Sequence, residues 1–396
     1  MSNTFTFSSK AKMISLICLG IGLLATIAGF MMAPDRAWSN LLQNSYFFMG
    51  VSLISVFFIA IHSVGYGGWF VAIKRIPEAI SHFLPIAGIF IAIIAIGAYA
   101  HIHHLYHWAV PGVGDPASEH FDAIIAAKLP YFSAPFFLTR VIGFIVIWVL
   151  LAAGLRKLSR KQDEDGNITH YTKSKTLSAI FLVVFGVSTS VLSWDLIMSI
   201  DTHWFSTLFG WYNFASYFVS GIAMILLFTI YMKHKGLLPN VNDSHIHDLG
   251  KFMFAFSIFW TYLWFSQYML QWYANIPEET FYFKARIDNV PFLFFLNVFI
   301  NFVFPFFILM TRRAKRNKEV VVLAACIILC GHWLDFWLMI APGAQHGHPH
   351  FGLLEITMPF LFIGAFIYVV FNALSKMPIL TPEKHPFIRE SVQHHI

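Results

Sequence analysis

Long apolar stretches separated by short polar segments recur along the whole chain. The hydrocarbon core of a bilayer is about 30 Å thick, so a helix that crosses it needs roughly 20 apolar residues. Ten stretches of this kind cover residues 13–33, 45–73, 83–104, 134–155, 176–198, 209–232, 249–273, 290–310, 320–341 and 351–374. The pattern predicts an all-α integral membrane protein with ten transmembrane helices in a single membrane domain, residues 1–396.

The composition narrows the class of protein further. Apolar residues make up 58% of the 396 residues and charged residues only 12%, whereas a soluble protein carries roughly 25% charged residues. This excludes a disordered chain, a nucleic-acid-binding protein and a soluble enzyme. Three cysteines are too few for a disulfide framework or an iron–sulfur cluster, and no Cys-x-x-Cys-His run could attach a c-type haem. We therefore expect the chain itself to bind no redox cofactor and no metal.

Lysine and arginine are distributed unevenly between the predicted loops. With the N-terminus in the cytoplasm, 21 of the 26 basic residues fall in cytoplasmic segments, four fall in outer loops, and Arg140 lies within a helix. Cytoplasmic loops carry such an excess, so the bias supports ten crossings with both termini in the cytoplasm. It also accounts for the net charge of +6 without a nucleic-acid partner. Residues 2–12 are polar and precede no signal-peptide cleavage site, and we expect a retained cytoplasmic tail.

The two halves of the chain resemble each other weakly. Pro135 and Pro291 each open a predicted Phe-rich helix that ends in a basic pair, and Asp195 and Asp335 each lie late in the next helix. We interpret helices two to five (residues 45–198) and six to nine (209–341) as two pseudo-symmetric four-helix bundles. The helices at 13–33 and 351–374 would flank them. Paired repeats often enclose a functional site in transport proteins.

Ionisable side chains inside the predicted helices are the first candidates for function, because burying them in lipid is costly. At 1.5 Å per residue, Asp335 lies about 22 Å from the inner face and Arg140 about 9 Å below the outer face. Most of the other ionisable groups also lie towards the outside. The candidates for a proton path are His62, Arg140, Asp195, His332, Asp335 and Glu355.

Each candidate also has a structural interpretation. An ion pair between Arg140 and Asp195 would tie two neighbouring helices together without any functional role. Glu355 is placed equally well to cap the start of its helix. His332 and Asp335, three residues apart on one helix face, would either relay protons by alternating charge states or form a buried hydrogen bond. The sequence leaves these alternatives open.

Histidines gather at the outer ends of the predicted helices. They form two groups, one of His101, His103, His104 and His107, and one of His346, His348 and His350. Imidazoles at such spacing bind zinc or copper in some proteins. No cysteine or carboxylate completes a ligand set in the sequence, so we interpret both groups as hydrated clusters at the membrane interface.

Gln267 and Gln271 lie one turn apart on the outer half of a predicted helix. Amide side chains in such positions commonly hold helices together by hydrogen bonds. The alternative is a quinol-binding site, to which His101, His104, Gln267 and Gln271 would contribute.

Two segments carry a resemblance to a known family. The first is SWDLIMS at 193–199, which continues to HWF at 203–205, and the second is SQYMLQWYANIPEE at 266–279. With ten spans, the chain resembles the NrfD-like (polysulfide reductase membrane subunit) family, and in particular the membrane subunits of bacterial alternative complex III, a quinol:cytochrome c oxidoreductase. The resemblance covers essentially the whole chain. It implies two four-helix bundles and two flanking helices in the bacterial inner membrane.

The resemblance also implies a respiratory role. In that complex, one NrfD-like subunit oxidises menaquinol beside an iron–sulfur protein, and multihaem cytochromes c pass the electrons to a terminal oxidase or a soluble cytochrome. The second NrfD-like subunit, to which this chain is similar, carries no redox centre and has been proposed to conduct protons. We therefore expect a non-redox subunit, surrounded by membrane lipids, with haem c and iron–sulfur clusters on its partners.

Three alternatives stay open. The chain would bind menaquinol in its own right, or serve only as an anchor for peripheral redox subunits, or act as a stand-alone secondary transporter. Ten spans and an internal repeat favour the transporter. Against it, no pair of helices is interrupted by Gly and Pro at matching mid-membrane positions, as transporters often show.

Overall fold

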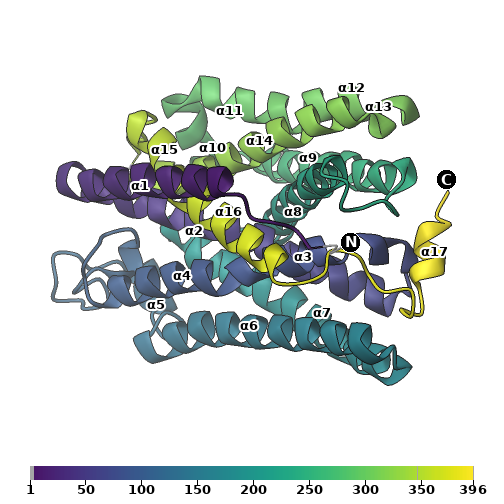
Figure 1. Ribbon diagram of the computed structural model, residues 1–396. Coiled ribbons are helices and arrows are strands. Elements are labelled where there is room, and N and C mark those ends of the chain that lie inside the picture. Colours follow the sequence, from purple (N-terminus) through teal and green to yellow (C-terminus); the bar gives the residue numbers. More distant parts are fainter. Residues whose placement is uncertain (1–3, 346, 396) are drawn as a thin grey trace.

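The computed structural model describes residues 4–345 and 347–395, which fold almost entirely into helices. The long helices run side by side in one bundle (Figure 1). In the described part of the chain, extended pairing is limited to an isolated bridge between Thr4 and Pro378. The all-α class predicted from the apolar pattern is therefore confirmed.

Nine helical stretches among the described residues are long and apolar enough to cross a membrane. They are α1 (Ser9–Met32), α2 (Pro34–Val64), α3 with α4 (Arg75–Ile80 and Leu84–Tyr99), α6 (Ala134–Asp165), α7 (Ile168–Leu196), α8 (Phe209–His234), α11 with α12 (Pro291–Val298 and Phe304–Leu309), α14 (Lys318–Ala344) and α15 with α16 (Leu353–Thr357 and Pro359–Ser375). These lengths and compositions are those of a multi-pass membrane protein.

The seventh predicted span, residues 249–273, lies within α9 (Asp243–Ala274). This helix has 32 residues, as many as α6, yet it does not belong to the nine stretches that are apolar enough to cross a membrane. Polar residues such as Thr261, Ser266 and Gln267 interrupt its apolar positions. Length and composition thus support nine crossings, and the tenth stays a prediction.

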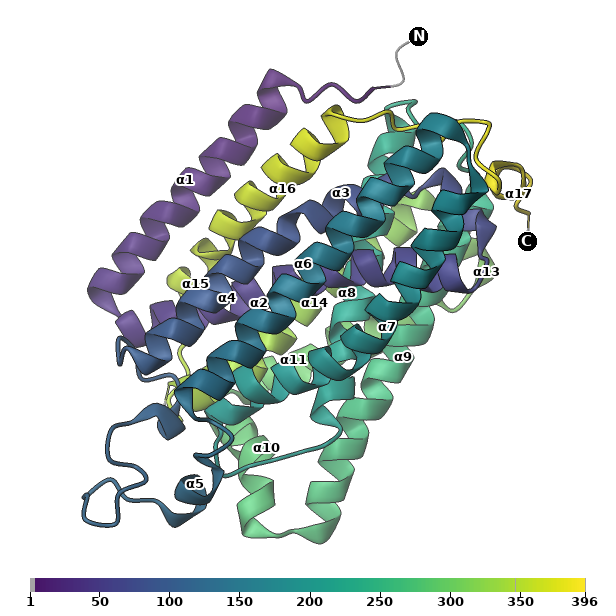
Figure 2. The same cartoon turned by 90° about the horizontal axis from the view of Figure 1, so that it is seen from below.

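Short helices fill the connections between the long ones. They are η1 (Gly68–Ala72), η2 (Ser81–Phe83), η3 (His107–Ala109), α5 (Ala123–Lys128), η4 (Met198–Ile200), α10 (Pro277–Asn289), α13 (Arg312–Arg316) and α17 (Ile388–Val392). Figure 2 shows α5 and α10 at one end of the bundle and α17 near the other. We call these the outer end and the inner end, following the bias of Lys and Arg towards the segments at the α17 end.

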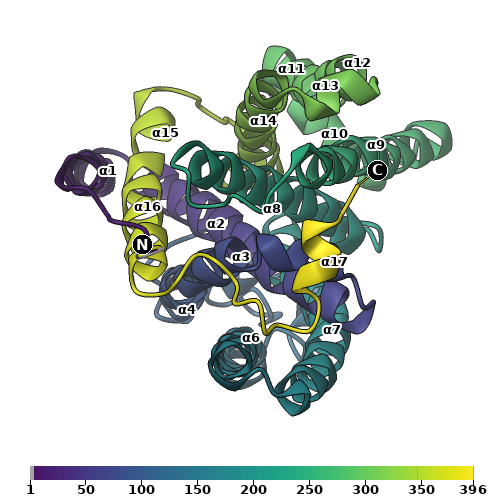
Figure 3. The same cartoon turned by 45° about the vertical axis from the view of Figure 1, so that its right-hand side comes forward.

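Helices α2 and α8 form the centre of the bundle. The most apolar part of α2 is 83% buried and that of α8 is 72% buried, against 22% for α1 and 28% for α6. The view along the bundle places α2 and α8 inside and α1, α6 and α9 at the periphery (Figure 3). The central pair also carries many small polar residues. Serines such as Ser52, Ser55 and Ser220 donate to the carbonyl four residues earlier, so burial leaves no hydroxyl unpaired at these positions.

Helices contact one another both within and between the two predicted groups, since α2 packs against α8 and α14, and α7 packs against α8. Helices α2, α4, α6 and α7 contact one another in sequence, and α8 contacts α9 and α14, while α12 contacts α9 and α14. Helix α1 lies outside both groups and packs mainly against α16. The pseudo-symmetry between the groups stays a prediction.

The segment between α11 and α12 departs from the regular α-helix. Residues Phe299–Val303 (η5) form a turn of π-helix, and Pro305 follows at the start of α12. Such turns occur frequently at functional sites because they change the direction of side chains. Here the π turn carries Asn301, whose side chain donates to Asn297 over 2.7 Å. This brings two amides into the interior of the bundle.

Candidate functional site

Asp335 of α14 lies at a point where four helices meet. Its side chain is fully buried and accepts hydrogen bonds from four neighbours. Two donors come from α8, the hydroxyl of Tyr212 and the hydroxyl of Ser216, which lies at 2.8 Å. The other two are the indole N–H of Trp260 on α9 and the side-chain amide of Asn297 on α11, each at 2.9 Å. A buried carboxylate without such partners would be very costly. The donors make this position tolerable for a charged or a protonated side chain.

No Lys or Arg in the described residues forms an ion pair with Asp335. The nearest basic group is His332 on the same helix face, whose Nδ1 lies 4.0 Å from Asp335 Oδ2. His332 is fully buried, and neither ring nitrogen has a hydrogen-bond partner among the described residues. The Trp260 ring meets the imidazole edge-on at 5.5 Å. The pair thus has two proton-accepting groups and unused hydrogen-bonding capacity.

A small cavity adjoins Asp335 on the outer side. It has a volume of about 20 Å³, and its walls include Tyr212, Gln267, Tyr282, Arg286, Asn297 and Asp335. One water molecule needs roughly 10–15 Å³ and two to four polar partners. The cavity therefore has the size and the polar lining for a single water molecule between Arg286 and Asp335.

Arg286 of α10 closes this cavity towards the outer end. It is buried, donates to the Leu338 and Met339 carbonyls of α14 at 2.8 and 3.0 Å, and pairs with Asp201 at 3.1 Å. Its guanidinium carbon lies 3.3 Å from the centre of the Tyr282 ring. The side chain thus anchors α10 onto α14.

The sequence analysis missed this arginine. Arg286 is one of the four basic residues that the prediction assigned to outer loops, whereas the structure buries it in the bundle. A usable signal was present: Pro342 lies inside α14 and has no N–H, so the carbonyl of Leu338, four residues earlier, lacks its helical donor. Such a carbonyl requires another donor.

Beyond Asp201 the protein is hollowed by an open cleft of about 890 Å³ at the outer end. Its polar lining includes His104, His107, Asp201, His203 and Glu278. Because Asp201 lines the cleft and pairs with Arg286, which lines the small cavity, a polar connection runs from the outer surface to Asp335.

Arg140 and Asp195 form the ion pair that the sequence allowed. Arg140 donates to both oxygens of the buried Asp195 carboxylate, at 2.9 and 3.1 Å, and lies over the Tyr131 ring at 3.9 Å. Next to it is a crevice of about 410 Å³ with a largely aromatic lining that includes Phe132, Trp194 and Phe205. The Trp194 N–H is buried without a partner in the part of the chain that the structure describes.

Glu355 belongs to a separate set of contacts. Its carboxylate accepts from Arg36 at 3.1 and 2.6 Å, from Asn40 at 3.1 Å and from the amide of Gly352 at 2.7 Å. The last bond caps the first turn of α15, as the structural interpretation required. The other three bonds, from Arg36 and Asn40, join α15 to α2, so the geometry favours a tie between helices.

His62 lies near the inner end of α2. Its Nδ1 is 2.7 Å from the Phe58 carbonyl, and its ring packs against Phe58, Trp69 and Phe70 at 4.3 to 5.0 Å. None of these partners contacts Asp335 or His332. The structure therefore does not join His62 to the outer group through direct contacts.

The four residues considered for quinol binding do not surround one cavity. Gln267 lines the small cavity beside Asp335 and accepts from Ser206 at 3.0 Å, whereas His104 lines the outer cleft. The Gln271 amide lies 3.0 Å from the Trp204 indole nitrogen, and His101 is exposed. Both glutamines bind the segment at 204–206 to α9, in agreement with a structural tie.

The outer histidines are dispersed. Among the described residues no three His, Cys, Asp or Glu side chains are arranged to hold a metal ion; His346 lies outside the described residues. His103 is buried, and burial together with a neighbouring imidazole, that of His104, lowers its pKa while its contact with the Ile94 carbonyl opposes the shift. No model of a protein family and no curated protein matches the chain.

Proposed function

We propose that this chain is a non-haem membrane subunit of a menaquinol-oxidising respiratory complex, of the NrfD-like ActF type in bacterial alternative complex III, and that it carries protons past Asp335. The segments at 193–205 and 266–279 support the family. The observation that supports the proton role best is the fully buried Asp335 carboxylate, bound by neutral donors beside the unpaired His332.

The proposal also covers the number of membrane crossings and the subunits with which the chain assembles. The chain would cross the bacterial inner membrane ten times, with α9 as the seventh crossing, in two pseudo-symmetric bundles. Its partners would be a second NrfD-like subunit, an iron–sulfur protein, multihaem cytochromes c and a terminal oxidase. The redox cofactors would be on those partners, and menaquinol would be oxidised outside this chain.

The proton route that we propose uses these contacts. Asp335 takes up or releases a proton, and His332 at 4.0 Å is the adjoining acceptor. On the outer side, the water-sized cavity leads to Arg286, Asp201 and the open cleft. On the other side, Asn297 connects Asp335 to Asn301, whose oxygen has no partner among the described residues. Groups that change charge or orient water are what a proton wire needs.

The first experiment tests the setting. The tagged chain is purified from its native membrane in mild detergent, and the redox spectrum of the product is recorded. We expect a large assembly with the spectrum of c-type haem, which this chain has no motif to attach. A colourless, solitary protein would contradict the family assignment and favour the secondary transporter.

The second experiment tests the proton role. The assembled complex is reconstituted in liposomes, and protons moved per electron are measured during quinol oxidation for Asp335→Asn. We expect assembly and electron transfer to persist while the proton yield falls, because Asn keeps the shape but cannot titrate. Glu355→Gln is the matched control and should leave the yield unchanged. An unaltered yield in Asp335→Asn would remove this residue from the path.

A second candidate function is favoured by one observation. The crevice beside Asp195 combines aromatic walls, a free indole N–H at Trp194 and a carboxylate, which together suit the ring of a quinol. Under this proposal the chain binds menaquinol itself. A photoreactive menaquinone analogue should then label residues of the crevice, and Trp194→Phe should reduce the labelling. Labelling confined to partner subunits would contradict it.

A further inference from the structure

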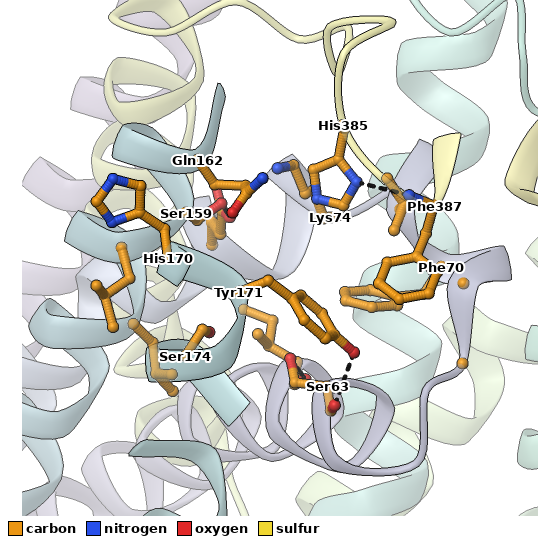
Figure 4. Close-up of a pocket in the computed structure, with 17 residues that line it drawn as sticks. Ser63, Phe70, Lys74, Ser159, Gln162, His170, Tyr171, Ser174, His385 and Phe387 are labelled. Carbon is orange, nitrogen blue, oxygen red and sulfur yellow. Dashed lines mark hydrogen bonds between the residues drawn. The ribbon is translucent and has the colours of Figure 1, made fainter. Parts of the chain in front are cut away.

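A second polar cavity lies at the inner end, near His62 and away from the groups around Asp335. It has a volume of about 40 Å³ and is lined by residues of α2, η1, α3, α6, α7 and the C-terminal segment. Figure 4 shows Lys74, Gln162 and His385 close together on one side and the rings of Phe70, Tyr171 and Phe387 on another. The space exceeds what one water molecule requires, which is roughly 10–15 Å³.

Gln162 is the most informative residue of this cavity. Its side chain is only 3% exposed, and neither its amide nitrogen nor its oxygen has a hydrogen-bond partner among the described residues. Nδ1 of His170, which also lines the cavity, is in the same state. Buried polar groups are nearly always satisfied. Atoms left free around a polar space of this size indicate bound water.

A group of four charged side chains adjoins the cavity. Lys74 pairs with Asp163 at 2.7 Å, Arg75 pairs with both Asp163 and Glu78, and Ser159 donates to Glu78. Their formal charges cancel, which is the condition under which a buried ionic group is tolerated. Lys74 and Glu78 line the cavity directly, so water within it would contact ionised groups.

The C-terminal segment lies across this cavity. We call residues 381–394 the C-terminal strap. It contributes His385 and Phe387 to the lining, and Phe387 packs on the Tyr171 ring at 4.8 Å. Thr381 donates to the Val71 carbonyl at 2.9 Å, and Lys384 donates to the Glu164 carbonyl.

Further along, the strap is fixed by polar contacts. Glu390 accepts from the Gly68 amide at 3.1 Å, and Ser391 both accepts from Ala72 at 3.0 Å and donates to Trp69 at 2.5 Å. His394 lies 2.6 Å from Asp248 of α9. Most of these bonds end on the backbone of η1. Segments without regular structure that are fixed by a few hydrogen bonds open locally more easily than the core does.

We propose that the inner cavity is a water-binding site centred on Gln162 and that the C-terminal strap is its removable seal. While the strap is docked, the cavity water is separated from the inner aqueous phase. When the strap lifts, water exchanges freely with the ionised group at Lys74 and Glu78. This inference does not depend on proton conduction through Asp335.

The seal is tested by the accessibility of a single cysteine. In a chain whose three cysteines are replaced, Ser174→Cys places a thiol in the cavity lining, and Thr172→Cys on the exposed face of α7 is the matched control. A membrane-impermeant maleimide is added from the inner side. We expect Ser174→Cys to react at least tenfold more slowly than Thr172→Cys. Equal labelling rates for the two cysteines would show that the strap does not seal the cavity.

Two sets of substitutions should then release the C-terminal strap from the bundle. Glu390→Ala with Ser391→Ala removes the bonds to η1, and His394→Ala removes the separate contact with Asp248. Each should accelerate labelling of Ser174→Cys about tenfold without changing Thr172→Cys, while the strap variant Gln393→Ala should have no effect. Unchanged labelling in both release variants would overturn the proposal, and the unfolding midpoint of each variant shows whether the bundle is intact.

The water is tested by radiolytic footprinting, in which hydroxyl radicals formed from bound water label adjacent side chains. Tyr171 should be labelled in the docked protein although bulk water is excluded. Gln162→Leu removes both free amide atoms and should reduce Tyr171 labelling at least fivefold. Labelling that is absent from the docked protein, or unaffected by Gln162→Leu, would show that the cavity holds no bound water on Gln162.

Discussion

The guanidinium of Arg286 donates a 2.8 Å hydrogen bond to the carbonyl of Leu338, which Pro342 leaves without its helical donor. The missing bond of α14 is thus replaced by a side chain from α10. The same guanidinium pairs with Asp201 on the outer side and lines the water-sized cavity on the inner side. Arg286 therefore replaces the hydrogen bond that α14 lacks at Pro342, and it also separates the outer cleft from Asp335.

Arg286→Lys should show how much the attachment of α10 to α14 and Asp201 depends on the shape of the guanidinium. Lysine keeps the charge but cannot reach Asp201 and the Leu338 and Met339 carbonyls together. We expect a loss of about 1–3 kcal/mol in the free energy of unfolding, measured in detergent. Lys284→Ala, an exposed change on the same helix, is the control. A loss no larger than that of the control would show that the carbonyls find another donor.

The Arg140–Asp195 pair allows its two interpretations to be separated. Asp195 is fully buried and the Arg140 side chain only 10% exposed, so Arg140→Leu strands a buried carboxylate at a cost of about 3–5 kcal/mol. Arg140→Leu combined with Asp195→Leu should recover most of that stability. If the pair is only a tie, the double variant also retains quinol oxidation in the assembled complex. Restored stability with lost quinol oxidation would support the crevice as a quinol site.

The fold could be predicted because its signals are local. An apolar stretch of sufficient length specifies a helix wherever it stands in the chain, and the nine stretches of the described residues that pass this criterion overlap nine of the predicted spans. Their ends were predicted less well: α2 covers Pro34–Val64, whereas the predicted span was 45–73. The neighbourhood of His332 and Asp335 was predictable for the same reason, since residues three apart share a helix face. Pattern alone did not settle α9, where polar residues interrupt the apolar stretch.

The remaining parts of the site come from contacts between distant segments. Tyr212, Trp260 and Asn297 reach Asp335 from 123, 75 and 38 residues away. Lys74 and Asp163 lie 89 residues apart in the sequence and form a buried pair. The pattern of apolar and polar residues along the chain does not indicate which distant segments come into contact. Arg286 is the exception, because Pro342 in the sequence already indicates that the Leu338 carbonyl needs a donor from outside its own helix.

The close crossing of α1 and α16 depends on a glycine. A Cβ atom at Gly22 would lie 1.9 Å from the Leu361 nitrogen, whereas one at Gly20 would meet nothing within 4 Å. Gly22→Val should therefore push α1 away from α16, because small residues let helix backbones approach closely in membranes. Protease sensitivity of the inner end of α1 should rise in Gly22→Val and not in Gly20→Val. Equal sensitivity would mean that α1 is held by other contacts.

His332 provides a test that separates stability from function. Both ring nitrogens are buried without partners among the described residues, so His332→Phe removes unsatisfied groups and should change the free energy of unfolding by less than about 1 kcal/mol. If the imidazole relays protons to or from Asp335, the proton yield per electron falls in the reconstituted complex. A variant of normal stability and normal yield would assign the relay to Asp335 alone.

Docking of the C-terminal strap should weaken in acid because of His385. Burial, together with the positive charges of Lys74 and Arg75, lowers the pKa of His385 to about 3. The docked strap therefore holds a neutral imidazole, while the released strap binds a proton below its usual pKa of roughly 6.5. Docking is then strongest above that pH and weakens as the pH falls towards 3, by at most about tenfold per pH unit.

Other groups at the strap set the controls for this prediction. Glu78 lines the same cavity and Asp163 adjoins it, and these two carboxylates oppose the charges of Lys74 and Arg75. His394 pairs with Asp248 further along the strap. The measurement is the ratio of maleimide labelling rates of Ser174→Cys and Thr172→Cys between about pH 7.5 and 5.5, a ratio that cancels the titration of the thiol itself. The ratio should rise in acid, and His385→Gln should flatten it. A slope that survives in His385→Gln would assign the pH dependence to another group at the strap, such as His245, whose ring lies 3.4 Å from the Ser391 hydroxyl.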